Sequence, residues 1–219
     1  MRGKKNKFAE NLLRDNVIEP GKTGYKTLQG KWASDFFRNT QPITLELACG
    51  WGEYTLGLSR LFNDRNFIGV DIKGDRLWKG SGIALEEDLK NAAFLRTQIE
   101  HLMDFFGPGE VSEIWLMFPD PRPKKRDAKR RITHSRFLDV YKQIISPGGL
   151  VRLKTDNTGL FEYSLEVLQA REDICALEYS FDLYSSDYSA DCYDIVTKYE
   201  KKFREAGEVI KYLQFRYIN

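Results

Sequence analysis

Strand-like and helix-like segments alternate through most of this 219-residue chain, and this alternation limits its fold more than any other feature. Two strand-like segments, 43–48 and 66–71, are each followed by a segment with the apolar spacing of a helix, 53–61 and 76–90. Strands separated by helices are joined as right-handed parallel crossovers. The sequence therefore predicts an α/β fold with a mostly parallel sheet.

The alternation continues to about residue 170, and the last 45 or so residues follow a different pattern. Residues 175–184 and 209–217 both read as strands, with a Ser-, Asp- and Tyr-rich loop and a helix at 198–205 between them. Neighbouring strands that close a sheet in this way are antiparallel. Further expected elements are strands at 94–97, 113–118 and 150–155, and helices at 99–106, 157–170 and from an N-cap at Thr133 to Ile145.

The composition excludes several classes of protein. No apolar run approaches the roughly 20 residues of a membrane span, and the basic N-terminus is not followed by the apolar stretch of a secretory signal. The three cysteines lack metal-ligand spacing, which is typical of a reduced, cytoplasmic protein. We expect a basic arm with a short helix near 32–37 in residues 1–40, and one domain in residues 41–219.

A glycine turn with an acid on the next strand indicates a nucleoside site. Gly50 and Gly52 follow the first strand, and Asp71 ends the second strand 19 positions after Gly52. Ligands of open parallel sheets bind at the carboxyl ends of the strands, where an acid can accept both ribose hydroxyls. Thr55 stands where a dinucleotide fingerprint needs its third glycine, so a phosphate-free adenosine ligand such as S-adenosylmethionine fits better. Each feature alone is also compatible with an ordinary turn or a loop acid.

The segment 118–131 gives the most specific indication of the chemistry that the protein performs. Asp120 follows an apolar strand and lies between prolines, which fix φ and predict a shaped loop. Six basic side chains follow within a few residues. A positioned acid beside a dense cationic strip suits an enzyme that acts on a base within a folded polyanion, although a charge run by itself is more often a solvated face.

Three ordered motifs show a resemblance to a known family. They are Phe-Pro-Asp-Pro-x-Pro-Lys-Lys-Arg at 118–126 with Lys-Arg-Arg at 129–131, Thr-Asp at 155–156, and Thr-Lys-Tyr-Glu at 197–200. From about residue 45 onward, the chain resembles the bacterial tRNA (guanine-N7)-methyltransferases. This resemblance implies a Rossmann-like class I methyltransferase fold, with a mostly parallel seven-stranded sheet, an antiparallel C-terminal hairpin and helices on both faces.

The resemblance also implies roles for individual residues. Asp120 is the expected catalytic residue, S-adenosylmethionine the expected cofactor and tRNA the expected partner, with no metal and no obligatory protein partner. The residues expected to bind the cofactor are Glu46, Gly50, Gly52, Asp71, Gln98 and Asp120. Those expected to face the substrate are Lys124, Asp156, Thr197, Lys198, Tyr199 and Glu200. The expected RNA phosphate contacts are Lys125, Arg126, Lys129, Arg130 and Arg131.

Three positions depart from the family pattern. Ala48 replaces a glycine before the turn, a change that is tolerated if the φ angle of Ala48 is negative. Gln98 stands where the family has Asp, so its amide oxygen reaches adenine from one methylene farther away. Arg122 replaces a Trp between the prolines and exchanges an apolar lid for a cation.

These residues suggest a mechanism without a general base. Guanine N7 has an in-plane lone pair and no proton, so methyl transfer depends on positioning and electrostatics. The methylated base is cationic, and we expect Asp120 to stabilise that charge and to accept hydrogen bonds from the guanine edge. Tyr184, Tyr188 and Tyr193 could stack on a flipped base or could pack on the sheet.

Two alternatives stay open from the sequence. One is a methyltransferase of the same fold that acts on another RNA or on a small molecule, which the basic strip and the segment 197–200 oppose. The other is an RNA-binding protein that has lost its cofactor, which Glu46, Asp71 and Asp120 oppose.

Overall fold

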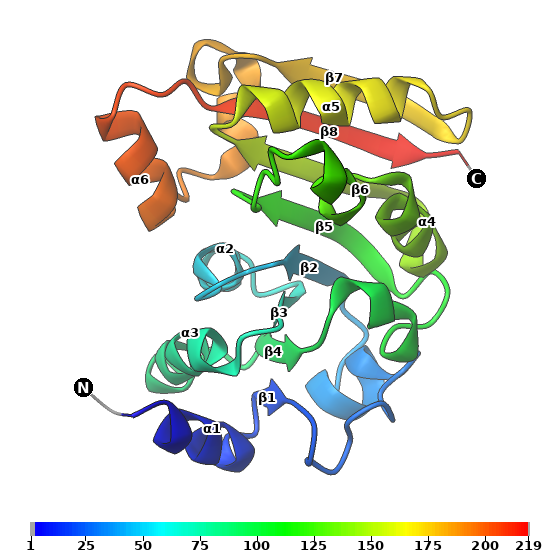
Figure 1. The fold of residues 1–219 in the computed structure, drawn as a ribbon. Coiled ribbons are helices and arrows are strands. Elements are labelled where there is room, and N and C mark those ends of the chain that lie inside the picture. The colour runs from blue at the N-terminus through cyan, green and yellow to red at the C-terminus, as the bar shows by residue number, and fades with distance from the viewer. Residues whose placement is uncertain (1–2, 219) are drawn as a thin grey trace.

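The protein has one eight-stranded sheet with helices on both faces (Figure 1). A computed structural model of the chain describes residues 3–218. The strand order is β1-β4-β3-β2-β5-β6-β8-β7, and only the pairs β6–β8 and β8–β7 are antiparallel among the described residues. The strands are β1 (Val17–Ile18), β2 (Ile43–Leu47), β3 (Asn66–Asp71), β4 (Ala92–Arg96), β5 (Val111–Met117), β6 (Ile145–Thr155), β7 (Ile174–Ser180) and β8 (Lys211–Tyr217).

The α/β class, the parallel majority and the antiparallel C-terminal hairpin are confirmed. The sheet has one strand more than the seven expected, because Val17–Ile18 pairs in parallel with β4 at the edge. The preceding residues, expected as part of an arm, form helix α1 (Lys4–Leu13). Asn11 of this helix donates to the carbonyl of Gly74 over 2.8 Å, which holds α1 against α3.

The remaining helices lie close to their expected positions. They are α2 (Glu53–Leu61), α3 (Gly74–Glu86), α4 (Ser135–Ile144), α5 (Thr158–Gln169) and α6 (Lys198–Glu205), with short helical turns η1 (Trp32–Phe37), η2 (Ile99–Asp104), η3 (Lys125–Arg130), η4 (Leu183–Ser185) and η5 (Asp187–Cys192). The N-cap of α4 is His134 and not Thr133, since the His134 side chain accepts from the N–H of Arg136, whereas Thr133 is buried against Ser164.

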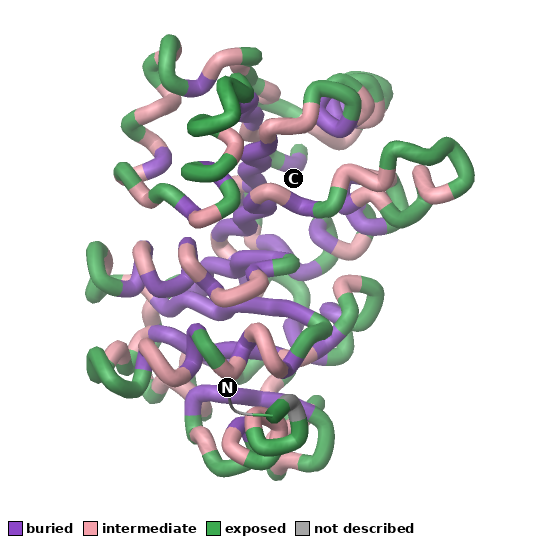
Figure 2. The backbone as a smooth tube through the Cα atoms, turned by 60° about the vertical axis from the view of Figure 1, so that its left-hand side comes forward, coloured by how far each residue is buried: buried purple, intermediate pink, exposed green. Residues whose placement is uncertain are grey.

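Alternation along the central strands separates two hydrophobic layers. Trp115 of β5 packs with Tyr54 of α2 on one face, and its neighbour Leu116 packs with Leu138 of α4 on the other. Figure 1 shows α2, α3 and α6 on one side of the sheet and α4 on the opposite side. In Figure 2 the strands form the buried centre and the outer turns of the helices are exposed.

The parallel register brings the carboxyl ends of four strands to one edge. Leu47 at the end of β2 pairs with Val70 of β3 and with Leu116 of β5, and β4 ends beside Asp71. The loops that follow these strands therefore lie next to one another along that edge. This edge carries the residues singled out from the sequence.

Candidate active site at the carboxyl edge of the sheet

The turn after β2 leaves its backbone open to a ligand. Gly50 has φ +60°, and a Cβ added there would meet nothing within 4 Å. Gly52 has φ +73°, and a Cβ there would lie 2.6 Å from the Phe94 ring. Gly50 therefore keeps a surface accessible, whereas Gly52 lets the turn pack closely on the sheet.

Ala48, which precedes this turn, has a positive φ angle. The angle is +55°, in the left-handed region, so the condition under which this replacement of glycine would be tolerated is not met. An L-residue other than glycine is strained there by roughly 1–2 kcal/mol. The side chain is exposed, so the strain comes from the backbone and not from packing.

Asp71 is fixed beside this turn. The side chain is buried, and its two oxygens accept from the N–H of Gly50 over 2.9 Å and from the N–H of Lys73 over 2.8 Å. Each carboxylate oxygen has a second lone pair. Asp71 can therefore bind a pair of hydroxyls without giving up the bonds that orient it.

Glu46 lies beneath the turn, inside the protein. Its Oε2 accepts from the backbone N–H of Thr55 over 2.7 Å and from the Thr55 hydroxyl over 2.6 Å. Burial raises the pKa of Glu46 to about 7, although both Thr55 bonds favour the charged form. A cation close to this buried carboxyl group would stabilise its charged form.

An open glycine backbone, a fixed acid on the next strand and a buried acid beneath the turn fit a cationic adenosine ligand. Gln98 extends the row, because it follows β4 and is exposed as the N-cap of η2. Its contact with adenine stays a prediction. Among the described residues, no group of three or more His, Cys, Asp or Glu side chains is placed to hold a metal ion.

The loop after β5 has an unusual backbone conformation. Phe118 and Arg122 both lie in the left-handed region, with φ +47° and +46°, on either side of Asp120. Strained backbone of this kind occurs preferentially at functional sites. The Asp120 carboxylate is exposed and lies 3.1 Å from Nε of Arg122, the residue that replaces the family's Trp.

The basic strip continues from this loop as η3. Lys124, Lys125, Arg126, Lys129 and Arg130 are all exposed. Arg131 is engaged instead, because its Nε donates to the carbonyl of Arg122 over 3.2 Å and its guanidinium lies 4.3 Å from the centre of the Tyr163 ring. Arg131 thus supports the loop from which the other cations extend.

Helix α6 carries the segment 197–200 across the same edge. Lys198 donates its backbone N–H to Glu53 over 3.0 Å, and its Nζ lies 2.9 Å from the centre of the Trp51 ring. Farther along, Phe203 stacks on Phe118 with ring centres 6.1 Å apart. The helix therefore connects the glycine turn after β2 with the Asp120 loop after β5.

The side chains expected to face the substrate differ in exposure. Thr197 is buried and caps α6 by accepting from the N–H of Glu200, and Tyr199 is 43% exposed. Glu200 is buried in an ion pair with Lys154. Burial raises the pKa of Asp156, which lies half-buried at the end of β6. Substrate contacts of these residues stay predictions, and in this conformation Glu200 faces the protein interior.

Sequence reasoning missed Lys154 and Trp51. Lys154 is the only lysine in the predicted strand 150–155, and a charged residue inside a central strand is a signal for a buried partner. Trp51 lies between the two turn glycines, where an aromatic side chain is unusual enough to be noticed. Their partners come from distant parts of the chain and could not be read from local patterns.

Two of the three tyrosines considered for base stacking are occupied by protein neighbours. Tyr188 stacks on Tyr212 with ring centres 5.6 Å apart, and Tyr193 contacts Phe62 edge to face at 4.9 Å. Tyr184 donates its hydroxyl to Glu200. The packing alternative therefore describes Tyr188 and Tyr193, whereas Tyr184 is 42% exposed.

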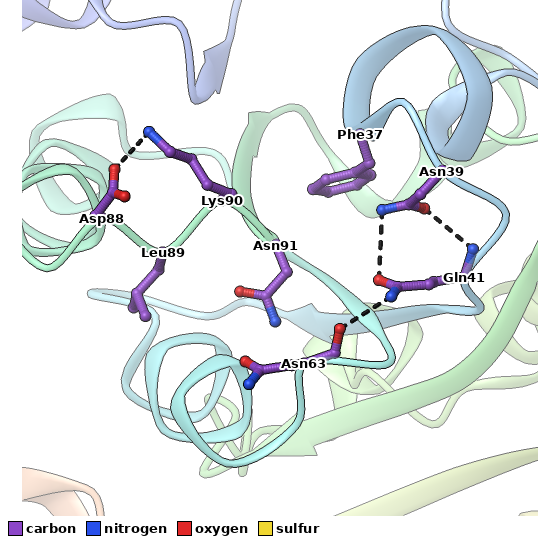
Figure 3. Close-up of a pocket in the computed structure, with 8 residues that line it drawn as sticks. All are labelled: Phe37, Asn39, Gln41, Asn63, Asp88, Leu89, Lys90 and Asn91. Carbon is purple, nitrogen blue, oxygen red and sulfur yellow. Dashed lines mark hydrogen bonds and ion pairs between the residues drawn. The ribbon is translucent and has the colours of Figure 1, made fainter.

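A cavity of about 370 Å³ lies at the opposite edge, before β2, β3 and β4 (Figure 3). Its amides already have partners, since Gln41 donates to the carbonyl of Asn63 over 2.9 Å and Asn91 donates to the carbonyl of Phe62 over 2.8 Å. These bonds tie the loops together. The cavity is far from the glycine turn and is not a candidate for the cofactor.

Comparison with known proteins relates the chain to methyltransferases. A family model described as "Putative methyltransferase" matches residues 40–213. The tRNA (guanine-N(7)-)-methyltransferase of Cytophaga hutchinsonii is 45% identical over 213 residues, which are 97% of this chain and 96% of that protein. The protein of the same name from Christiangramia forsetii is 44% identical, over 98% of this chain and 99% of that protein.

Solved structures support the fold alone. The 16S rRNA methyltransferase KamB matches with a TM-score of 0.60 and 14% identity, covering 82% of this chain and 88% of KamB. The Haemonchus contortus phosphoethanolamine N-methyltransferase 2, solved with S-adenosyl-L-methionine, matches with a TM-score of 0.51 and 14% identity, covering 99% of this chain and 57% of that one. Within residues 3–218, no helix has the length and apolar character needed to cross a membrane.

Proposed function

The chain belongs to the tRNA (guanine-N7)-methyltransferase family, and on that premise we propose that Asp120 is its catalytic residue and that the carboxyl edge of the sheet is its active site. The enzyme transfers a methyl group from S-adenosylmethionine to N7 of a guanine in tRNA. The guanine lies in the variable loop, and the reaction takes place in the cytoplasm. The observation that supports this best is the placement of Asp120 in the loop after β5, because β5 pairs with β2, whose open glycine turn lies beside Asp71 at the end of β3.

The cofactor supplies a methyl group activated on a positively charged sulfur. Asp71 would hold the ribose hydroxyls, with Gly50 allowing close approach and Gln98 lying near adenine. Glu46 would face the positive charge of the sulfur, because a nearby cation offsets the cost of burying a charged carboxylate. All of these groups lie along one row of strand ends.

Asp120 would act on charge and not on a proton. N7 of guanine carries no hydrogen, so no base is required, and positive charge develops on the purine as the methyl group is transferred. A carboxylate beside the ring stabilises that charge and can accept from guanine N1–H and N2–H₂. Arg122, which now pairs with Asp120, would have to release it toward the base.

The exposed cations of η3 supply the RNA contacts. Lys125, Arg126, Lys129 and Arg130 extend from a helical turn directly after the Asp120 loop. Phosphate neutralisation by such side chains makes binding steeply dependent on salt. We therefore expect tRNA affinity to fall strongly between low and physiological ionic strength.

The test is methyl transfer from labelled S-adenosylmethionine into bulk tRNA, followed by nucleoside mapping. We expect N7-methylguanosine from the wild type and a loss of about 100-fold or more in turnover at saturating donor for Asp120→Asn. Asp127→Asn is a matched control, because Asp127 lies in the same strip but pairs with Arg130 at 3.6 Å. Normal turnover by Asp120→Asn, or a product other than N7-methylguanosine, would refute the assignment.

A further inference from the structure

The backbone on either side of Asp120 has a conformation that its own sequence disfavours. Phe118 has φ +47° and Arg122 has φ +46°, both in the left-handed region. Each of these residues directly precedes a proline, and a residue in that place prefers extended backbone. Backbone of this kind persists only where the surrounding structure holds it. The loop 118–122 therefore depends on contacts from outside it.

The Asp120 carboxylate takes its position from this loop. Its Oδ1 accepts from the backbone N–H of Arg122 over 3.3 Å, and its Oδ2 lies 3.1 Å from Nε of the same residue. The Asp120 side chain is exposed to solvent. Because both of these partners belong to the loop, a change in the loop backbone moves the carboxylate with it.

Different elements hold the two ends of the loop. At its end, the carbonyl of Arg122 accepts from Nε of Arg131 over 3.2 Å. At its start, the N–H of Phe118 donates to the carbonyl of Lys154 over 2.9 Å. The Phe118 ring also stacks on the ring of Phe203 in α6, with centres 6.1 Å apart and an interplanar angle of 26°. Phe203 thus supplies an aromatic contact exactly where the left-handed backbone begins.

Phe203 extends from a helix that has anchors of its own. Lys198 at the start of α6 donates its backbone N–H to Glu53 over 3.0 Å, and Glu200 pairs with Lys154 at 2.6 Å. Glu200 and Phe203 are three positions apart, so they lie on the same face of the helix. Figure 1 shows α6 beyond the ends of β5 and β6. The place of the Phe203 ring is therefore set by contacts that do not involve the loop.

We propose that Phe203 is a positioning residue for Asp120. By stacking on Phe118 it holds the left-handed backbone at the start of the loop, and the loop holds the carboxylate where the reacting guanine binds. Phe203 acts without touching the reacting atoms. A small displacement of Asp120 would lower the rate strongly, because electrostatic stabilisation depends on preorganised geometry. The inference rests on the proposed function, since Phe203 acts only through Asp120.

The first test compares the turnover of three variants at saturating donor and tRNA. Phe203→Leu keeps apolar bulk but loses the ring stack, and we expect turnover to fall about tenfold or more. Phe203→Tyr keeps the ring, so its turnover should stay within about twofold of the wild type.

The third variant, Phe62→Leu, is the matched control. Phe62 packs against the same hydrophobic cluster as Phe203 and contacts Tyr193 edge to face at 4.9 Å. It lies at the C-cap of α2, at the edge of the sheet opposite the Asp120 loop. We expect Phe62→Leu to lower the thermal midpoint about as much as Phe203→Leu does and to keep normal turnover.

The second test repeats Phe203→Leu in the Asp120→Asn background. Residues that act as one unit are not additive, so the further loss of turnover should be less than about twofold. An equal loss in both backgrounds would mean that Phe203 acts independently of Asp120, and this would overturn the inference. Turnover of Phe203→Leu within about twofold of Phe62→Leu, or an equal loss in Phe203→Tyr, would also overturn it.

Failure of the proposed function gives a different result. Normal turnover by Asp120→Asn alone, or a product other than N7-methylguanosine from the wild type, would refute the proposed function whatever the Phe203 variants do. A large loss in Asp120→Asn with normal turnover in Phe203→Leu would leave the proposed function intact and remove only the role of Phe203. The two failures are therefore separable.

Discussion

Nζ of Lys154 lies 2.6 Å from Oε1 of Glu200, and both side chains are almost completely inaccessible to solvent. Lys154 also donates to the Tyr54 hydroxyl over 3.2 Å, and the Tyr184 hydroxyl donates to Glu200. The pair connects the strand that leads to Asp156 with the helix that carries the segment 197–200. It thereby fixes where α6 lies over the active-site edge.

Removing one partner of this pair should be costly, because the other charge stays buried without compensation. We expect Lys154→Met to lower the free energy of unfolding by about 3–5 kcal/mol, measured by urea denaturation. The double variant Lys154→Met/Glu200→Leu should recover much of that loss, since it buries no charge. A loss below about 1 kcal/mol for Lys154→Met would show that Glu200 is not left as an uncompensated buried charge in that variant.

Glu46 should make stability depend on pH. Its pKa is raised by burial from 4.5 to about 7, so the folded protein retains a proton that the unfolded chain releases. Protonated Glu46 contributes fully to the free energy of unfolding below about pH 4.5. This contribution is lost as the pH rises toward 7, and the total loss is roughly 3 kcal/mol. Glu46→Gln cannot ionise, so its free energy of unfolding should lack this decline.

The measurement is urea denaturation of both proteins at several pH values between 4.5 and 7. If the free energy of unfolding changes with pH in the same way for wild type and Glu46→Gln, Glu46 does not titrate in this range. Calorimetry gives an independent reading, because an ionised Glu46 should bind the cationic methyl donor more tightly. Donor affinity of the wild type should rise as the pH passes through about 7, and that of Glu46→Gln should not.

Ala48→Gly should stabilise the protein. Glycine adopts the φ of +55° without strain, and the exposed Ala48 methyl group contributes little packing. We expect a gain of about 1 kcal/mol in the free energy of unfolding, after the greater entropy of glycine in the unfolded chain is allowed for. Ala84→Gly, in the buried face of α3, is the control and should destabilise by a similar amount. Destabilisation by Ala48→Gly would show that this backbone is not strained.

Local sequence patterns predicted the helices and strands that are defined by neighbouring residues alone. The bounds of α2, β3 and α6 agree with the sequence prediction, because apolar spacing and flanking turns define them. The strand Val17–Ile18 could not be predicted, since two residues show no periodicity and only β4 makes them a strand. The burial of Glu200 was equally hidden, because its partner Lys154 lies on a different element.

Arg122 should weaken binding of the cationic methyl donor, since its Nε lies 3.1 Å from the Asp120 carboxylate in the free enzyme. Arg122→Ala removes this competing cation, and we expect calorimetry to show donor affinity up to about fivefold tighter, the limit set by an exposed ion pair. Arg130→Ala is the control, because Arg130 is a similarly exposed arginine of the strip that pairs with Asp127 and not with Asp120. The free energy of unfolding should change by less than about 0.5 kcal/mol in either variant. Weaker donor binding by Arg122→Ala would mean that Arg122 orients Asp120 and does not compete for it.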